Sequence, residues 1–234
     1  MIRADMHIHT YYSDGGQSPE DVVAGAKRAG VNLISVTDHD NSNGRHIVKE
    51  LAAKAGIRAV DGEEISAYEG EVKVHILGYG MDYSDPAYVA FAKALYEDAE
   101  ERTLDILNKL KKVHVNISYG EVLRERRCDK SPLHAVHIAV AGARKGYASS
   151  PWTFYGKYLN LGAAGFSCIK RPSPEQTARM IKECGGVCSL AHPGRITMEA
   201  EGVTALIERL IPCGLAGIEA VYSGHTFNET QYYK

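Results

Sequence analysis

The 234-residue sequence contains no apolar run that approaches the ~20 residues of a membrane-spanning helix. Its first residues alternate polar and apolar side chains, which differs from the apolar core of a signal peptide. These absences exclude a membrane partner and favour a cytoplasmic location. With 44% hydrophobic residues, the chain can bury the core of one α/β domain that carries a small inserted subdomain.

The sequence also has few cysteines and a small net charge. The five cysteines have no framework spacing, which indicates reduced thiols. Cys184 and Cys188 flank the segment 185–187, but one lies at a predicted helix end and the other in a predicted strand, so we interpret both as core thiols. The formal net charge of −2 gives no general attraction to nucleic acids or anionic membranes. Any affinity for phosphate must therefore come from a local site.

The stretch from Asp5 to Gly15 gives the first indication of a metal site. Alternate side chains of a β-strand share a face, so His7 and His9 point the same way and can bind one cation. Asp14 follows on a glycine turn, where the loop can hold it over a neighbouring cation. For this pair alone, strand histidines with ordinary hydrogen-bond partners are the more common explanation, so the later residues decide.

After this strand the chain alternates buried strands and amphipathic helices. Helices are predicted over 18–30 and 45–55, and strands over 33–37, 57–60 and 72–79. This order is typical of a parallel sheet or a β/α barrel. Strand patterns disappear after Asp85 and return only beyond residue 173. We therefore predict a metal-binding barrel over 1–84 and 166–234, with an inserted helical subdomain, a lid, over 85–165.

Side chains of the types that bind metals recur where the predicted strands end. Each one alone has an ordinary explanation, such as a capping carboxylate or a core histidine with a hydrogen-bond partner. Because barrels and open α/β sheets place their chemistry at the carboxyl ends of strands, the joint occurrence predicts a metal centre. The candidates are His7, His9, Asp14, His39, Glu64, His75, His192 and His225.

Several pieces of the sequence, in this order, resemble the PHP (polymerase and histidinol phosphatase) family of metal-dependent phosphoesterases. The pieces are residues 5–10 with 13–15, 37–40, 62–66, 75–79, 191–195 and 217–219. The resemblance implies a distorted seven-stranded β/α barrel with two or three divalent metal ions. It implies a first ion bound by His7, His9 and Glu64. Glu64 would bridge to a second ion held by His75 and His192, and Asp14 and His39 would hold a third.

One part of the family pattern is missing. The family closes its site with a late Gly-Ser-Asp-x-His motif that supplies an aspartate and a histidine ligand, and no such motif follows residues 217–219. We therefore expect that the C-terminal β/α unit of the barrel is absent from this chain. The first and third ions would each lack one ligand, so the functional assignment concerns the intact protein.

The expected chemistry follows from the ligand types. Imidazoles and carboxylates without cysteine favour manganese, with iron or zinc as alternatives, over a structural thiolate zinc site. Such ions would activate a water molecule as the nucleophile, so no catalytic side chain is assigned. The expected reaction is hydrolysis of a mono- or cyclic phosphate ester. Arg195 is a candidate phosphate contact, although an arginine at a strand end is often a solvated charge.

The substrate is expected to be a small phosphorylated metabolite such as a ribose phosphate or nucleotide. Family members that act on nucleoside 3′,5′-bisphosphates have an arginine before the histidine matched by His137 and a lysine in a Gly-Lys-Pro segment, and both are missing here. Lys170 and Arg171 are candidate replacements. His137, on a predicted helix over 135–144, and His225 are further candidate contacts, and the resemblance predicts that His137 faces the metals. Arg124, Arg126, Arg127 and Lys130 would suit a short oligonucleotide, but acidic neighbours favour a solvated helix face.

Two other functions compete with phosphate-ester hydrolysis. Amidohydrolase barrels that cleave C–N bonds also begin with two alternating histidines, but the pair Asp14 and His39 favours phosphate. A non-catalytic, regulatory PHP module would also retain the fold, but the set of ligand residues from His7 to His192 shows no decay. The sequence leaves the oligomeric state open.

Overall fold

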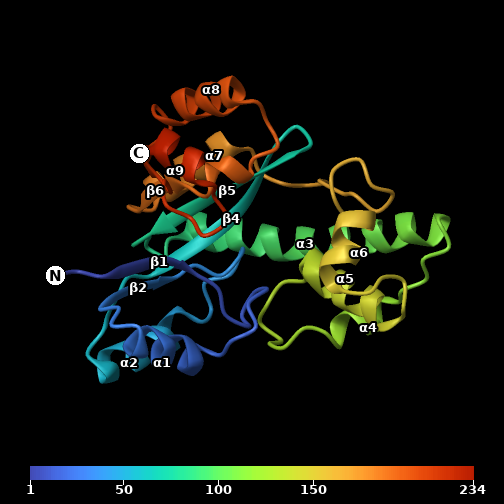
Figure 1. Cartoon of the computed structure of the whole chain (residues 1–234), viewed down its shortest axis with the longest axis horizontal. Coiled ribbons are helices and arrows are strands. Elements are labelled where there is room, and N and C mark those ends of the chain that lie inside the picture. Colours follow the sequence, from blue (N-terminus) through green and yellow to red (C-terminus); the bar gives the residue numbers. More distant parts are fainter.

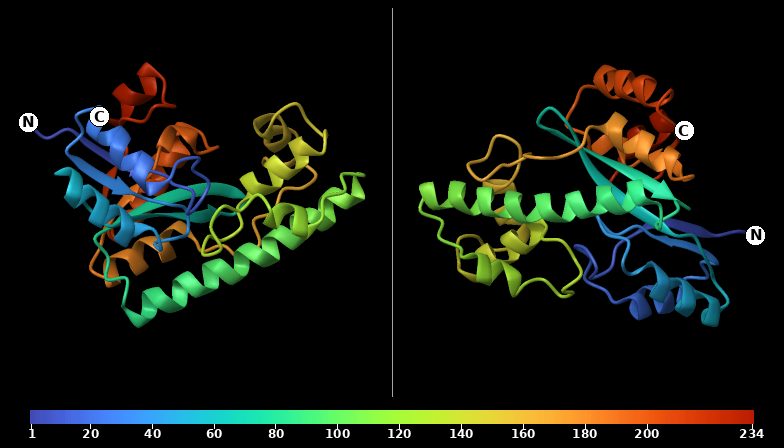
Figure 2. Two further views of the ribbon diagram at one scale, coloured as in Figure 1. Left: turned by 90° about the horizontal axis from the view of Figure 1, so that it is seen from below. Right: turned by 180° about the vertical axis from the view of Figure 1, so that it is seen from behind.

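The computed structural model describes residues 1–234, which form two units joined by one long helix (Figure 1). One unit contains all the strands, and the other is helical. Helix α3 (Pro86–Lys112) runs along both units, as the two views in Figure 2 show. None of the helices combines the length and the apolar character that crossing a membrane requires.

The first sheet is parallel and contains β1 (Ala4–Ile8), β2 (Leu33–Val36) and β3 (Arg58–Ala59). Helices α1 (Pro19–Arg28) and α2 (Arg45–Ala55) cover one face, and their apolar sides enclose a core with β2. A capping box between Ser18 and Asp21, with Pro19 in the first turn, starts α1 as predicted. Both helices return the chain to the same end of the sheet, so β1 and β2 end side by side.

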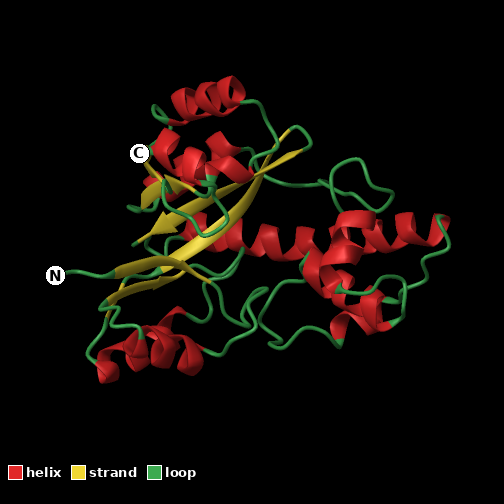
Figure 3. Cartoon of the chain, in the orientation of Figure 1, coloured by secondary structure: helices red, strands yellow, loops and turns green.

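The second sheet contains β4 (Gly62–Glu69), β5 (Val72–Tyr79), β6 (Val187–Leu190) and β7 (Leu215–Ile218), in that order. Helices α7 (Pro174–Glu183), α8 (Ala200–Leu210) and α9 (Phe227–Tyr233) lie beside it (Figure 3). Only β6 and β7 are parallel, because β5 is antiparallel to both β4 and β6. An isolated bridge between His39 and Glu64 connects the two sheets.

The α/β class is confirmed, but the single seven-stranded barrel predicted from the resemblance is replaced by sheets of three and four strands. The strand directions also differ from an all-parallel β/α barrel, because the connection between β4 and β5 has only two residues. A parallel crossover needs a dozen or more residues, so this connection permits only an antiparallel hairpin. Gly70 adopts a φ of 61° there, which a tight turn requires.

The helical unit has a core of its own. It contains α4 (Tyr119–Leu123), α5 (Ala135–Arg144) and α6 (Pro151–Tyr158), and its buried apolar residues lie between Ile106 and Leu159. Helix α3 contributes to both cores, since Tyr88 and Leu95 pack with the second sheet and Ile106 with the helical unit. The inserted subdomain over 85–165 and its role as a lid stay predictions.

Candidate metal centre

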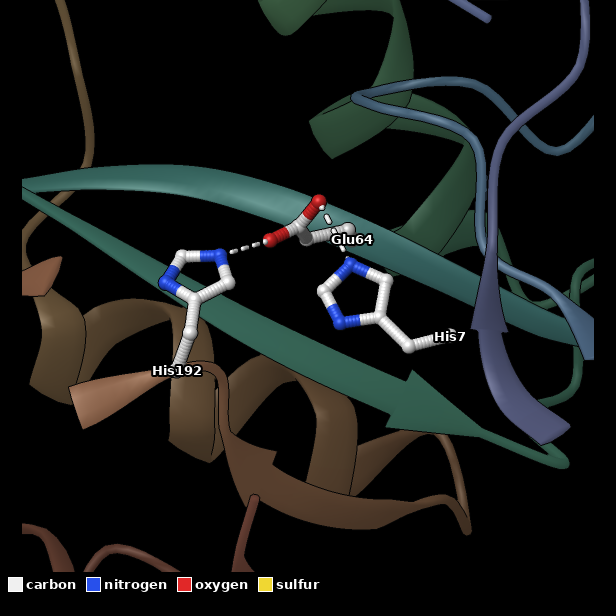
Figure 4. A group of neighbouring side chains, drawn as sticks. All are labelled: His7, Glu64 and His192. Carbon is white, nitrogen blue, oxygen red and sulfur yellow. Dashed lines mark hydrogen bonds and ion pairs between the residues drawn. The ribbon is translucent and has the colours of Figure 1, made fainter. Parts of the chain in front are cut away.

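Five imidazole rings surround the carboxylate of Glu64, which is only 1% exposed and lies on β4 at the junction of the two sheets. Its Oε2 atom lies 3.0 Å from His7 Nε2, 3.1 Å from His9 Nε2 and 3.2 Å from His39 Nδ1. Its Oε1 atom lies 2.9 Å from both His75 Nδ1 and His192 Nε2. Figure 4 shows His7 and His192 approaching Glu64 from opposite sides. The structure therefore brings His192 to Glu64 across 128 positions of the sequence.

The spacing of the ring nitrogens fits divalent ions. Two ligand atoms about 2.1 Å from one ion lie about 3.0 Å apart at a right angle and about 3.4 Å apart at a tetrahedral angle. The Nε2 atoms of His7, on β1, and of His9, just past the end of β1, are 3.0 Å apart. His75 Nδ1 and His192 Nε2 are 3.4 Å apart. The donors are imidazoles and carboxylates without thiolate, the set that suits manganese, iron or zinc.

Two groups of ligand atoms each lie within 4.8 Å of one another: His7, Glu64 and His192 in one, and His9, His39 and Glu64 in the other. Glu64 belongs to both, which agrees with a bridging carboxylate. The grouping separates His7 from His9, whereas the family resemblance places both on one ion. Asp14 approaches from its loop, with Oδ2 3.7 Å from His39 Nε2 and Oδ1 3.4 Å from His9 Nδ1. Which residue binds which ion stays a prediction.

The ionisation of the site also favours cations. Burial opposes the charge of Glu64, but His39 and His75 hold its pKa well below the usual range. Burial likewise opposes the charge of Asp14, but His39 and His9 lower its pKa to about 2. Against the effect of burial, hydrogen bonds to Glu219 and Glu64 raise the pKa of His7 to about 10. The carboxylates thus attract positive charge strongly, and divalent ions would satisfy that attraction.

Glu219, just after β7, is a supporting residue to which the sequence analysis gave no role, although it belongs to one of the matching pieces. Both of its carboxylate oxygens lie 3.1 Å from His7 Nδ1, and Oε2 accepts a 2.8 Å hydrogen bond from the backbone N–H of His192. Such a partner fixes the ring orientation and tautomer of a histidine ligand. His192 itself has a φ of 26°, a conformation that non-glycine residues rarely adopt.

The loop that carries Asp14 is fixed by a second buried carboxylate. Asp38 accepts hydrogen bonds from the backbone N–H and the hydroxyl of Thr10, at 2.7 and 2.6 Å, and from the hydroxyl of Ser13, at 2.6 Å. Gly15 packs directly against His9, where an added Cβ would lie 2.6 Å from the carbonyl carbon of His9. Only glycine therefore fits at this position, and the loop folds closely over β1.

A cavity of about 1130 Å³ opens over the metal-site candidates and extends to the helical unit. All seven predicted metal ligands line it, and so do Arg195 and Arg171 among the predicted substrate contacts. The other substrate candidates are not part of its lining. Lys170 pairs at the surface with Glu101, and His225 Nε2 accepts a 3.2 Å hydrogen bond from the backbone N–H of Gly194.

The predicted contact of His137 with substrate stays a prediction, and in the structure its ring is engaged at the start of α5. Its Nδ1 accepts a 3.0 Å hydrogen bond from the backbone N–H of His134 at the start of α5, so the ring caps its own helix. The histidine that lines the cavity here is His134, the N-cap residue of α5, whose ring centre lies 5.9 Å from that of His39. The cavity is further lined by Arg102, Tyr155, Trp152 and Tyr222, none of which was a sequence candidate.

Comparisons with known proteins show the family of this chain. A model of the PHP domain matches residues 5–137. The chain is 31% identical over 225 residues to phosphoribosyl 1,2-cyclic phosphate 1,2-diphosphodiesterase of Eggerthella lenta, a match that covers 95% of this chain and 84% of that protein. It is 32% identical over 238 residues to 3′,5′-nucleoside bisphosphate phosphatase of Chromobacterium violaceum, covering 98% of this chain and 80% of the relative.

One further relative and one solved structure extend the comparison. A 5′-3′ exoribonuclease of Haemophilus influenzae is 29% identical over 236 residues, covering 97% of this chain and 82% of that protein. A solved structure from Chromobacterium violaceum, described as an amidohydrolase with bound sulfate and no metal, superimposes with a TM-score of 0.90 at 29% identity. That superposition covers 98% of this chain and 81% of the other, so the fold is shared over almost the whole length.

Proposed function

Because the chain belongs to the PHP domain family, we propose that it hydrolyses a phosphate ester of a phosphorylated pentose or nucleotide at a centre of two or three divalent metal ions. Hydrolysis of a phosphoric ester is the reaction class that the names of the relatives share. The identity of the ester, the identity of the metals and the roles of the residues are parts of the proposal. The observation that carries it is the convergence of five imidazoles on the two oxygens of buried Glu64.

Divalent ions at this centre would supply Lewis acidity toward the phosphoryl group and toward a water nucleophile. Glu64 would bridge two ions, with His7 and His9 beside one of its oxygens and His75 and His192 beside the other. Glu219 holds His7 with its Nδ1 atom turned away from the centre, which leaves Nε2 for a metal. We infer manganese as the preferred ion, with iron or zinc as alternatives.

The chain's own cations would orient the phosphate. Arg195 follows His192 in the short helix Pro193–Arg195 and lines the cavity, so its guanidinium can bind phosphoryl oxygens next to the metals. Tyr222 lines the same part of the cavity, with its ring centre 5.1 Å from that of His192. Burial raises the pKa of Tyr222, so its hydroxyl stays protonated at neutral pH and can donate a hydrogen bond to a phosphate oxygen.

A pentose phosphate is favoured over an oligonucleotide because the basic run near residue 126 is engaged within the protein. Arg126 donates to Tyr96 and Ser131, and Arg127 donates to the backbone carbonyl of Gly16. The exoribonuclease relative keeps a short RNA as the second candidate substrate. C–N hydrolysis is less favoured, because the approach of Asp14 to His39 supports a third cation next to the phosphoryl group.

The test is metal reconstitution of the full chain followed by a screen for phosphate release. We expect manganese to restore activity after chelation, with turnover of cyclic or simple phosphate esters of ribose and nucleosides and no turnover of amides. The variant Glu64→Gln should abolish both metal retention and phosphate release. An exposed control, Glu208→Gln on α8, should retain both. Phosphate release that survives Glu64→Gln or complete chelation would refute the proposal.

A further inference from the structure

The turn over 192–195 carries a proposed metal ligand, His192, at its first position and a proposed phosphate contact, Arg195, at its last. Arg195 is exposed, so the place of its guanidinium depends on the backbone of this turn. Two backbone N–H groups are satisfied locally. Arg195 donates to the carbonyl of His192 at 2.8 Å, and Ile196 donates to that of Pro193 at 3.1 Å. Proline has no N–H, so only the N–H groups of His192 and Gly194 need partners from outside the turn.

Both outside partners come from the segment that follows β7. Glu219 accepts the hydrogen bond from the backbone N–H of His192. His225 Nε2 accepts the hydrogen bond from the backbone N–H of Gly194, at 3.2 Å. An N–H group can only donate, so this nitrogen carries no proton, and the ring is the neutral tautomer with its proton on Nδ1. Glu219 thus holds the first end of the turn. His225 holds the part next to Arg195.

His225 is itself fixed in place. Its backbone N–H donates to the carbonyl of Tyr222 at 3.0 Å, and its Nδ1 atom lies 3.4 Å from the carbonyl oxygen of Ala220. The ring centres of Tyr222 and Tyr233 lie 5.3 and 5.7 Å from that of His225. The turn packs closely against this imidazole, since a Cβ added at Gly194 would lie 3.0 Å from His225 Cδ2. The side chain therefore supports the turn, and it does not line the cavity.

We propose that His225 is a positioning residue, which fixes the turn through Gly194 and thereby sets the direction in which Arg195 presents its guanidinium to a phosphoryl group. This inference rests on the proposed phosphoesterase function and adds to it a residue that contacts neither substrate nor metal. It differs from the sequence expectation, in which His225 contacts the substrate itself. The role requires a neutral acceptor at the place of Nε2, which the side-chain oxygen of glutamine can supply and leucine cannot.

The binding test uses inorganic phosphate and the manganese-loaded full chain, with the Kd measured by calorimetry. For His225→Leu we expect the Kd to rise about three- to tenfold with unchanged manganese content, the effect of weakening a hydrogen bond between charged groups without removing it. His225→Gln should stay within about twofold of the wild type, because it keeps an acceptor for Gly194. The exposed control His46→Leu on α2 should leave the Kd unchanged.

The same variant in an Arg195→Met background tests whether His225 acts through Arg195. There His225→Leu should change the Kd by less than about twofold, because the two residues act as a unit. An equal rise in both backgrounds, equal losses for leucine and glutamine, or an unchanged Kd in His225→Leu would overturn the proposal. If His225→Leu does not fold, His225→Asn, whose shorter side chain does not reach Gly194, takes its place.

A structural measurement separates failure of this inference from failure of the proposed function. Amide hydrogen exchange at Gly194, followed by NMR on the full chain, should be faster in His225→Leu than in the wild type and in His225→Gln, because the N–H loses its acceptor. The amides of β6 should keep their exchange rates. If the wild type binds phosphate but hydrolyses no ester, the proposed function fails, and the Kd series still decides the role of His225. Unchanged exchange at Gly194 in His225→Leu, or no binding of phosphate by the wild type, would refute the inference.

Discussion

Both carboxylate oxygens of Glu219 lie 3.1 Å from Nδ1 of His7, across 212 residues of sequence. This contact fixes the ring that we assign to the first metal. Glu219→Gln should weaken the contact, because a neutral amide attracts the imidazole N–H less strongly than a carboxylate does. Loss of such a partner typically costs about 10–100-fold in metal affinity. We expect phosphate release to fall at limiting manganese and to recover at excess manganese.

The control for Glu219→Gln is Glu208→Gln, which changes an exposed carboxylate on α8 in the same chemical way. Titration of both variants with manganese would measure the two affinities directly. Equal affinities in the two variants would show that Glu219 has only a structural role.

His192 should behave as a direct ligand. Its Nε2 atom lies 2.9 Å from Glu64, and its ring has no place in the hydrophobic cores. His192→Ala should therefore lower metal content by about one ion per chain and abolish most phosphate release, because an open coordination position binds the ion weakly. Metal analysis after gel filtration, with the exposed His46→Ala as control, measures this effect. Unchanged metal occupancy would remove His192 from the ligand set.

Local patterns were sufficient to find the residues that converge on Glu64 in the structure. His7 and His9 could be found because alternation in a strand is a property of neighbouring residues, and His39, Glu64 and His192 could be found because each directly follows or lies within a strand pattern. The α1 boundaries could be predicted for the same reason, since the capping box is local. The role of Glu219 could not, because its partner His7 lies at the other end of the chain.

Arg102 and the sheet arrangement were missed for related physical reasons. From the sequence alone, an arginine in the helical pattern of α3 is expected to be a solvent-exposed charge. Only the packing of α3 against both units buries it. The hairpin between β4 and β5 was visible as Glu69-Gly70-Glu71, but the β/α rhythm of the preceding segments favoured a parallel arrangement. A short turn is therefore stronger evidence about strand direction than the alternation of strands and helices around it.

The helical unit should depend on the contact between Gly142 on α5 and Phe154 on α6. A Cβ at Gly142 would lie 2.2 Å from the ring of the fully buried Phe154. Gly142→Ala should therefore destabilise the chain by about 1–3 kcal/mol, as overpacking does. Gly156→Ala, at an exposed helical position with nothing within 4 Å, should instead stabilise it by about 0.5–1 kcal/mol.

Urea unfolding followed by circular dichroism would measure both glycine variants. If residues 85–165 unfold as a separate unit, Gly142→Ala should shift one transition and leave the other unchanged. A neutral Gly142→Ala would contradict the close packing of α5 on α6.

Substitutions of His134 and His137 distinguish a side chain that contacts substrate in the cavity from one that stabilises the fold. His134 lines the cavity, and its buried Nε2 atom has no partner. Burial holds its pKa well below the usual value, so the ring is neutral and can exchange a hydrogen bond with substrate. His134→Ala should lower kcat/KM about 3–10-fold, the effect of one neutral hydrogen bond, with metal content unchanged.

His137→Ala should act on stability instead, because its Nδ1 atom accepts the hydrogen bond that caps α5. Loss of a cap costs about 0.5–2 kcal/mol, which unfolding measurements detect, while kcat/KM of the folded fraction should stay near the wild-type value. The sequence analysis assigned the substrate contact to His137 through the family resemblance, and the two variants decide between these assignments. A raised KM in His137→Ala together with wild-type kinetics in His134→Ala would restore the original one and would require α5 to turn its other face toward the cavity when substrate binds.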